Sequence, residues 1–426
     1  MTEVRIDAYD AIRRDALAGI ERRRLRPDDQ PGEVRVEVDR AVDEYQRRVR
    51  TAGGLPIGDP EAMVLRVLRS ITALGPLSDL LARRDVEEIF VEGARVTYLD
   101  GAGRLHGLAE PTTEGENRQI LDRLLAVTER QLNAKHPIVQ ARVLDGTARL
   151  TAAIPPVADR LSATLRRYTV REVSIARLVA SGTLDERAGL FLNLAMRFRS
   201  RIAISGEPGA GKTTLLAALL AAVPTAHCVR VCEEIREIAV PLVHGGYYEV
   251  RTPGLDGEGG ISLRDLVKFV LAMRPDRIVV GEVRGAEAFE LTRAVNAGCG
   301  FLCTVHANRA GEVIDALVNA ALMAGENVTE AIVRRVFSAA IDLVVHVDRG
   351  DSAEGEGIRR RVTEIAAVVP GFGDRATLEP LFVRTAPACP LEWTGAIPPA
   401  LEERMGRVLS GGRALRAVLD SGGAAA

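Results

Sequence analysis

The residues whose types and spacing could do chemistry are concentrated in one stretch, 206–214, which has the sequence GEPGAGKTT. Binding the phosphates of a nucleotide requires several backbone N–H groups directed at one point, and glycines allow this close approach because they carry no side chain. A lysine adds a point charge for the β- and γ-phosphates, and the threonine after it is placed to hold Mg²⁺. We therefore predict a phosphate-binding loop, in preference to a glycine-rich surface turn, made by Gly206, Glu207, Pro208, Gly209, Ala210, Gly211, Lys212, Thr213 and Thr214.

Two acidic strand ends and a histidine could complete a hydrolytic site around this loop. Glu282 follows the apolar run 278–280, and Glu233 ends the strand-like run before it. Nucleotide hydrolysis needs carboxylates for Mg²⁺ and for the attacking water, a sensor of the γ-phosphate, and positive charge. We predict that Glu233 and Glu282 are these carboxylates and that His306 contacts the γ-phosphate. Arg284, two residues after Glu282, is expected at the same opening of the site. Taken singly, solvated strand ends and a structural histidine are the common alternatives.

The segments around these residues predict the fold that positions them. The apolar run 201–205 is expected to be a buried strand, and 215–222 a helix that Pro224 ends. Further strand-like apolar runs, several of them separated by helical patterns, follow at 227–232, 277–280, 300–305 and 342–347. This alternation is typical of an α/β fold with a largely parallel sheet, whose ligand site lies at the carboxyl ends of the strands.

The length of 426 residues is too great for one ordinary core, and composition changes suggest four regions. We predict a helical N-terminal extension at 1–60, a smaller α+β domain at 61–168, the α/β domain at 169–373 and an irregular tail at 374–426 with one helix near 400–419. Within the α+β domain we expect a β-hairpin at 86–93 and 95–101 and a helix at 115–130. Less regular structure is expected at three places: a linker at 53–56, an exposed hairpin loop at 351–361 and a disordered end at 422–426.

Composition and cysteine usage exclude several classes of protein. Lys and Arg total 56 against 58 for Asp and Glu, and the net charge of −2 gives no global reason to expect nucleic acid as a partner. With no signal-like N-terminus and no apolar run of membrane-spanning length, we expect a cytoplasmic protein. A zinc site is one interpretation of two cysteine pairs, Cys228 with Cys232 and Cys299 with Cys303, the second of which precedes His306. Each pair has three residues between its members and lies in an apolar run, and these features favour buried thiols.

Four motifs follow one another in order along the second half of the chain. They are GEPGAGKTT at 206–214, CEEIREI at 232–238, MRPDRIVVGEVRG at 273–285 and TVHAN at 304–308. This ordered set resembles the type II/type IV secretion ATPases, and more narrowly the CpaF-like branch that powers assembly of tight-adherence (Flp) pili. The segments LGPLSDLL, VEEIFVEG, HPIVQARVLDGTARLTAAIPP and LRRYTV are similar to the N-terminal domain of that branch, and TEIAAVVPG to the segment after its core. The resemblance covers roughly residues 64–372.

This resemblance implies a RecA-like ATPase core that uses ATP and Mg²⁺, preceded by a PAS-like N-terminal domain. It implies that Lys212 and Thr213 bind phosphate and Mg²⁺, that Glu233 and Glu282 are the catalytic and metal-binding carboxylates, and that His306 senses the γ-phosphate. Members of the family work as hexameric rings in which arginines of the N-terminal domain reach the nucleotide, and we expect ATP to lie between the two domains. The positions that match these arginines are Arg142 and Arg149, with Arg166 and Arg167 as a basic pair that leads into the core.

The resemblance also implies partners and a place in the cell. The protein would be a homo-oligomer, peripheral at the inner face of the cell membrane, and would act on inner-membrane platform proteins of a pilus or export machine. A RecA-like DNA-transfer motor is one alternative, which the near-neutral charge disfavours. A nucleotide-gated assembly scaffold with little turnover is the other, because Glu234 stands where the family's motif has an aspartate.

Overall fold

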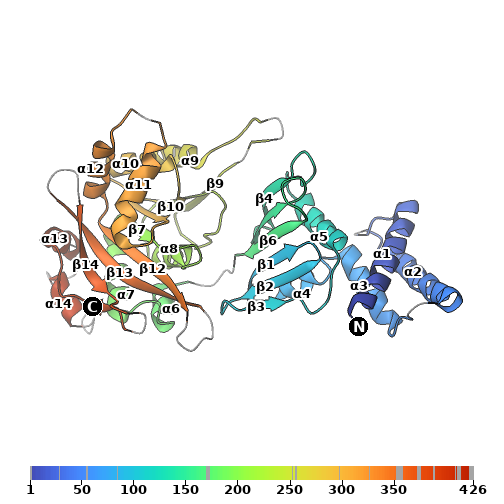
Figure 1. Cartoon of the computed structure of the whole chain (residues 1–426). Helices are drawn as coiled ribbons and strands as arrows, with labels where there is room; N and C mark the ends of the chain where they lie inside the picture. Colours follow the sequence, from blue (N-terminus) through green and yellow to red (C-terminus); the bar gives the residue numbers. More distant parts are fainter. Residues whose placement is uncertain are drawn as a thin grey trace. The chain divides into compact units, whose positions relative to one another are not determined.

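The computed structural model describes residues 2–27, 29–53, 56–83, 85–168, 173–251, 253–254, 257–296, 298–325, 327–351, 358–371, 376–386, 389–407, 409 and 414–421. The chain divides into two compact units, Met1–Thr169 and Val170–Ala426 (Figure 1). Three of the predicted segments fall wholly or in part outside the described residues: the linker at 53–56, the hairpin loop at 351–361 and the end at 422–426.

The first unit begins with three helices that have a hydrophobic core of their own. They are α1 (Thr2–Arg22), α2 (Pro31–Ala52) and α3 (Pro60–Thr72). Proline in the first turn starts α2 and α3, and Asp59 caps α3 by accepting the N–H of Ala62. The apolar side chains that recur on one face of each helix are buried together, among them Ile12, Ala16, Val34, Val38, Val67 and Ile71. This confirms the predicted helical N-terminal extension.

The rest of the first unit is an antiparallel sheet with two helices on one face. Its strands are β1 (Val86–Glu92), β2 (Arg95–Asp100), β3 (Leu105–Gly107), β4 (Ile138–Val143), β5 (Ala148–Ala153) and β6 (Ser162–Arg167), in the order β3-β2-β1-β6-β5-β4. The helices α4 (Leu77–Ala82) and α5 (Glu114–Ala126) share one core with the sheet. The predicted hairpin of β1 and β2 is confirmed. The helix predicted at 115–130 ends earlier, where the Thr128 hydroxyl donates to the Leu125 carbonyl.

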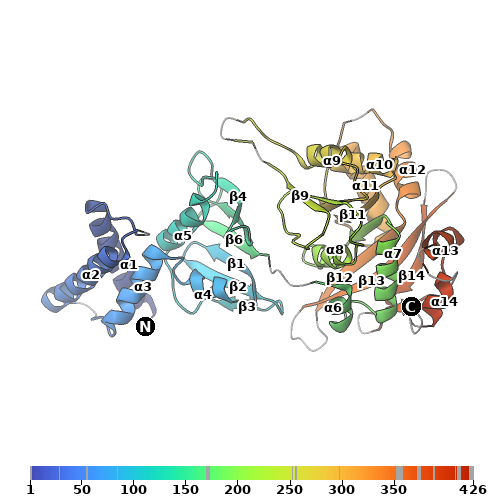
Figure 2. The same ribbon diagram turned by 180° about the vertical axis from the view of Figure 1, so that it is seen from behind.

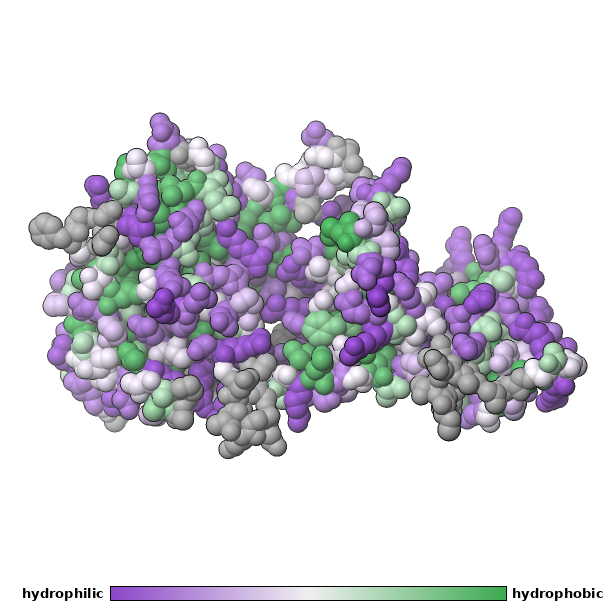
Figure 3. Space-filling model, in the orientation of Figure 1, coloured by the Kyte–Doolittle hydropathy of each residue, from purple (hydrophilic) through white to green (hydrophobic). Residues whose placement is uncertain are grey.

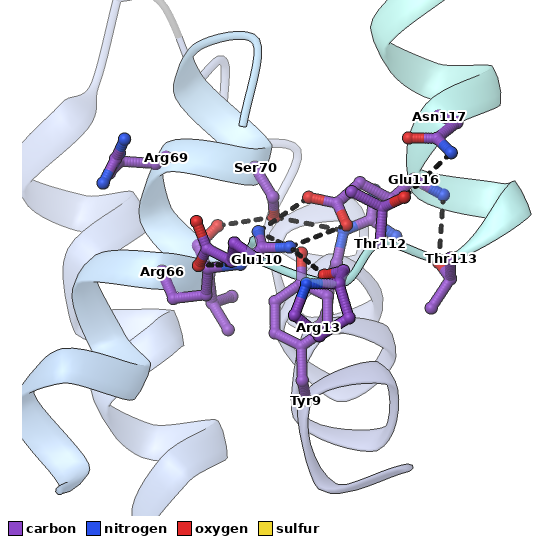
Figure 4. Close-up of polar contacts among 12 residues, drawn as sticks. Tyr9, Arg13, Arg66, Arg69, Ser70, Glu110, Thr112, Thr113, Glu116 and Asn117 are labelled. Carbon is purple, nitrogen blue, oxygen red and sulfur yellow. Dashed lines mark hydrogen bonds and ion pairs between the residues drawn. The ribbon is translucent and has the colours of Figure 1, made fainter. Parts of the chain in front are cut away.

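A buried polar cluster joins the three helices to α5 (Figure 4). The guanidinium of Arg66 on α3 donates two hydrogen bonds to the carboxylate of Glu116 on α5, at 2.7 and 3.0 Å. It also donates to the hydroxyl of Tyr9 on α1 at 2.9 Å and lies over that ring. Glu116 is fully buried, and burial raises the pKa of Tyr9. The two hydrophobic cores of the first unit are therefore connected by a charged, fully hydrogen-bonded joint.

The second unit is built on a nine-stranded sheet with the order β15-β14-β13-β12-β7-β11-β10-β8-β9. The six strands from β12 to β9 are parallel to one another, and β13, β14 and β15 add antiparallel pairs at one side. Their bounds are β7 (Ile202–Ser205), β8 (Val229–Glu233), β9 (Gly245–Glu249), β10 (Arg277–Val283), β11 (Gly300–Val305), β12 (Leu343–Asp351), β13 (Ile358–Pro370), β14 (Ala376–Val383) and β15 (Glu392–Trp393). The largely parallel sheet agrees with the prediction.

Helices cover both faces of this sheet (Figures 1 and 2). The first group is α6 (Ile175–Ala180), α7 (Glu186–Arg197) and α8 (Lys212–Ala221), and the second is α9 (Leu263–Leu271), α10 (Glu287–Asn296), α11 (Val313–Leu322) and α12 (Glu330–Ala340), with the short 3₁₀ helix η1 (Ala310–Glu312). Successive strand residues point to opposite faces, so that Ile202 and Ile204 pack in the first core and Ala203 in the second. Because both faces are covered, the central strands are continuous apolar runs.

The prediction of an irregular tail after residue 374 is wrong. This segment supplies β14, β15 and two helices, α13 (Pro399–Gly406) and α14 (Leu415–Asp420). The ring of Phe382 lies 5.6 Å from that of Phe191 on α7 and 5.1 Å from that of Trp393. Prolines leave no apolar run long enough to predict these elements. Side chains of the elements and of their connections nevertheless belong to the first core of the sheet, including Leu381, Leu391, Ile397, Leu401, Met405, Leu415 and Leu419.

The face of the molecule in Figure 3 is largely polar. Figure 3 shows hydrophilic residues over much of one face, with apolar residues in separate small groups. Among the helices described here, none is long and apolar enough to cross a bilayer.

Candidate active site

The loop between β7 and α8 has the backbone geometry that phosphate binding requires. Gly206, Gly209 and Gly211 have φ angles of 152°, 75° and 97°, a region that other residues rarely adopt. Gly211 is also the N-cap of α8 and offers no side chain to its first N–H groups. These N–H groups, at the positive end of the helix dipole, are donors of the kind that bind an anion. The loop residues therefore fit the phosphates of a nucleotide.

Lys212 is directed back into this loop. Its Nζ donates to the carbonyls of Gly206 and Glu207, at 2.8 and 3.0 Å, and lies 3.3 Å from Nδ1 of His306. The side chain is only 7% exposed. A buried ammonium is a site where phosphate oxygens would gain strong electrostatic interactions. In the same first turn of α8, Thr213 is half-buried and Thr214 is exposed.

Glu282 and His306 are brought into contact at the ends of neighbouring strands. Nε2 of His306, directly after β11, contacts Oε1 of Glu282 near the end of β10, and Arg284 forms an ion pair with the same carboxylate. The register of β10 against β11 is irregular between Val280 and Val283, which turns Glu282 toward His306. Burial and the nearby Lys212 charge lower the pKa of His306, so the ring is neutral at pH 7.

Glu233 lies on the adjacent strand in a more enclosed place. It is 4% exposed, and its carboxylate accepts hydrogen bonds from the N–H groups of Glu237 and Ile238 at 3.1 and 3.2 Å. Gly281 of β10 makes room for it, since a Cβ there would lie 2.8 Å from the Glu233 Cγ. Burial raises the pKa of Glu233 to about 8. Such a carboxyl group ionises readily only when a cation reaches it.

The raised pKa of Glu233 predicts how stability depends on pH. The folded protein keeps a proton on the Glu233 carboxyl group that the unfolded chain releases above pH 4.5. The contribution of this protonated group to the free energy of unfolding is therefore complete below pH 4.5, and it is lost as the pH rises to about 8. We expect nucleotide-free protein to lose on the order of a few kcal/mol between pH 5 and pH 8 through this group. Denaturant unfolding at several pH values would measure it in wild type, in Glu233→Gln and in the exposed-neighbour control Glu234→Gln. Equal pH slopes in the two variants would contradict the expectation.

The two arginines predicted to act in catalysis lie in the first unit. Arg142 on β4 is opposite Arg149 on β5, and Arg149 is opposite Arg166 on β6. Arg166 is in turn opposite Glu88 on β1 and forms an ion pair with it. The flanking residues of these strands belong to the core with α4 and α5, so this row occupies the other face of the sheet. Nε of Arg142 donates to the Gly146 carbonyl at 3.0 Å. Arg167 does not belong to the row and donates to the Arg83 carbonyl.

The cysteines near the site are buried thiols. Burial raises the pKa of Cys232 and of Cys303 to about 12, so both thiols are protonated at pH 7. In the described part of the chain, no group of three or more His, Cys, Asp or Glu side chains is arranged to hold a metal ion.

Several residues of the site were missed from the sequence. The carboxylate of Glu287 accepts the N–H groups of Arg284 and Gly285 at 2.6 and 2.8 Å and so fixes the turn after Glu282. Arg349 and Arg360, from the β12–β13 hairpin, lie against the phosphate loop. An acidic residue at the start of a helix is a detectable N-terminal signal. The two arginines gave no local signal, because their link to the loop spans 151 residues in the case of Arg360 and Gly209.

Comparisons with known proteins agree with this geometry. A putative conjugal transfer protein of Mycobacterium tuberculosis is 34% identical over 322 residues, covering 73% of this chain and 90% of the relative. The type IV secretion system protein VirB11 of Bartonella quintana is 27% identical over 336 residues, covering 69% of this chain and 92% of the relative. Among solved structures, the ATPase DotB of Legionella pneumophila superposes with a TM-score of 0.51 at 16% identity, covering 68% of this chain and 79% of that one.

These structural neighbours confirm the predicted α/β fold with a RecA-like core. The structure itself shows the smaller α+β domain and the helical extension that precede this core in the chain. The model of the family described as "Type II/IV secretion system protein" matches residues 70–349. With the match to the mycobacterial relative, this shows that the chain belongs to the type II/IV secretion system protein family.

Proposed function

We propose that the protein is an ATP-hydrolysing motor of a secretion or pilus system. The observation that carries this proposal is the contact series from Lys212 to His306 to Glu282, contributed by α8 and by the ends of β11 and β10 around the phosphate loop. Phosphoryl transfer depends mainly on positioning and on charge, and this series places a cation, a neutral ring and a carboxylate at one edge of the sheet.

Each residue of the site has a role in this proposal. The phosphate loop and Lys212 bind the phosphates of ATP. Thr213, Glu233 and Glu282 would hold Mg²⁺, which supplies charge neutralisation at the phosphates. Glu282 orients the attacking water, and His306, held by Glu282 and close to Lys212, senses the γ-phosphate.

The proposal extends to an assembly of several copies. Arg142, Arg149 and Arg166 follow one another across β4, β5 and β6, so three guanidinium groups share one face of the first unit. A stripe of positive charge of this kind suits the triphosphate of a nucleotide. We propose that Arg142 and Arg149 act on the nucleotide in a homo-oligomeric ring, a hexamer, in which hydrolysis changes the angle between the two domains.

The finer assignment is to the tight-adherence pilus branch of the family. It rests on the ordered motifs between residues 206 and 308 and on the upstream segments from LGPLSDLL to LRRYTV. In this proposal the ring acts on the cytoplasmic face of the inner membrane, as a peripheral protein docked on platform proteins, and drives pilin extraction or substrate export.

A DNA-transfer motor is the second candidate, because the mycobacterial relative is described as a putative conjugal transfer protein. Stimulation of ATP hydrolysis by single- or double-stranded DNA that disappears at high salt would favour it over the pilus motor.

The test of the proposed motor uses Glu282→Gln, which keeps the size of the side chain and removes its charge. We expect the variant to bind ATP and to hydrolyse it roughly 100-fold or more slowly, since one preorganised group supplies about that factor. Glu330→Gln, an exposed carboxylate on α12, is the matched control. Steady-state turnover should be measured together with mass by light scattering, with and without ATP and Mg²⁺.

The outcomes separate the candidates. Loss of turnover in the Glu282→Gln variant alone, with assembly into a ring of about six copies, supports the motor. A monomeric wild type that binds ATP and does not hydrolyse it would instead support a nucleotide-gated scaffold.

A further inference from the structure

The β12–β13 hairpin runs along the outer side of the phosphate loop. β12 pairs in parallel with β7, and the last pair is His346 opposite Ser205. The residues of β12 after His346 therefore lie beside the start of the phosphate loop, which follows Ser205. The carbonyl oxygen of Val347 lies 2.2 Å from the position that a Cβ on Gly206 would take. In both views α8, which starts at the loop, lies beside β12 (Figures 1 and 2). The loop and the hairpin are therefore in direct contact.

Two arginines of the hairpin touch the other two glycines of the loop. Arg349 and Arg360 are opposite each other on β12 and β13. Nη1 of Arg349 is 3.0 Å from the Cβ position of Gly209, and Cδ of Arg360 is 3.5 Å from that of Gly211. Nε of Arg360 also donates a hydrogen bond of 2.9 Å to the carbonyl of Gly209. A side chain at either glycine would meet an arginine.

The loop is thus held by cations from two directions. Lys212 binds the carbonyls of Gly206 and Glu207, and Arg360 binds the carbonyl of Gly209. Carbonyl groups engaged in this way have a fixed orientation, which fixes the neighbouring N–H groups of the same loop as well. The Arg360 bond is charge-assisted, and its planar guanidinium fixes direction as well as distance.

We propose that Arg360 is a positioning residue for nucleotide binding, which acts through the Gly209 carbonyl to hold the phosphate loop in its binding conformation, with Arg349 as the adjacent cation. This role rests on the proposed ATPase function. Loss of the Arg360 bond lets the loop populate other conformations, and the apparent affinity for nucleotide falls by the fraction that remains competent. Catalytic groups on β10 and β11 are unchanged, so the effect belongs to binding.

The test is Arg360→Gln in the full chain, with Arg359→Gln as the control. Arg359 is the exposed neighbour on the same strand, so the control makes the same charge change on the opposite face of β13. We expect Arg360→Gln to raise the KM for ATP and the Kd for ADP roughly five- to tenfold, because a charge-assisted hydrogen bond is lost and this one is solvent-exposed, which reduces its contribution. Its kcat should stay within about twofold, and Arg360→Lys should recover part of the affinity.

A second measurement addresses the loop itself. Hydrogen exchange of the nucleotide-free protein should be faster at residues 206–211 in Arg360→Gln and unchanged in the interior of β7 and α8. The proposal is overturned if Arg360→Gln binds ADP as tightly as Arg359→Gln, if the loss lies in kcat alone, or if loop exchange is unaltered. A wild-type protein that neither binds ADP nor hydrolyses ATP would refute the proposed function instead, and the exchange comparison would still decide the role of Arg360.

Discussion

Replacing Lys212 by alanine should abolish ATP hydrolysis, with a loss in kcat/KM of roughly 1,000-fold or more. The Lys212 ammonium is buried, holds two loop carbonyls and lies 3.3 Å from His306. Its removal therefore takes away the charge for the phosphates, one support of the loop and the neighbour of the histidine together. The measurement is steady-state turnover, with the Kd for ATP determined in parallel.

The variant needs two comparisons. Lys268→Ala removes the same group from an exposed position on α9 and should keep wild-type turnover. Lys212→Met keeps most of the side-chain volume, so equal losses in Lys212→Ala and Lys212→Met would identify charge as the cause. Wild-type turnover in Lys212→Ala would show that the site has been assigned to the wrong residues.

Glu116→Ala should strongly destabilise the joint between the N-terminal helices and α5. The carboxylate is fully buried and holds both terminal nitrogens of Arg66, which is itself mostly enclosed (Figure 4). Removing one partner leaves a buried charge without compensation, which costs about 3–5 kcal/mol. Hydrogen exchange of the full chain should accordingly rise roughly 150- to 5,000-fold in α1 and α3.

The control for this variant is Asp122→Ala on the same helix. Asp122 forms an exposed pair with Arg118, and its loss should cost under about 1 kcal/mol. The double variant Arg66→Met with Glu116→Leu removes both charges and should regain much of the stability, because apolar residues can replace a buried pair. Equal exchange in Glu116→Ala and Asp122→Ala would show that the buried pair does not hold the helices in place.

The positions of several candidate site residues in the fold were predictable from the sequence, because each signal lies within a few residues. The glycines and Lys212 of the loop, and the acids that follow apolar runs, are recognisable from spacing alone, since parallel strands end at one edge of a sheet. The pairing of His306 with Glu282 follows from the same rule. The enclosed position of Glu233 does not, because it depends on Gly281 in a different strand.

Structure that depends on distant contacts was not predictable. Arg66 and Glu116 occupy ordinary helical positions, and nothing near them in the sequence indicates that they meet. The elements after residue 374 are too short and too rich in proline to show a period, although Phe382 and Met405 are fully buried. In both cases tertiary packing, rather than local propensity, determines the structure.

The strand order has a consequence for synthesis of the protein on the ribosome. The strand that carries the phosphate loop, β7, is flanked by β11 and β12. Ser205 therefore cannot form its hydrogen bond with His346 until that residue, 141 positions later in the chain, has been synthesised. Pairings of such long separation form slowly, since the intervening chain must first be ordered. The first unit, by contrast, is complete at Thr169 and can fold during translation. The candidate nucleotide site therefore forms only after most of the second unit has been synthesised, and early nascent chains expose the apolar edge of β7.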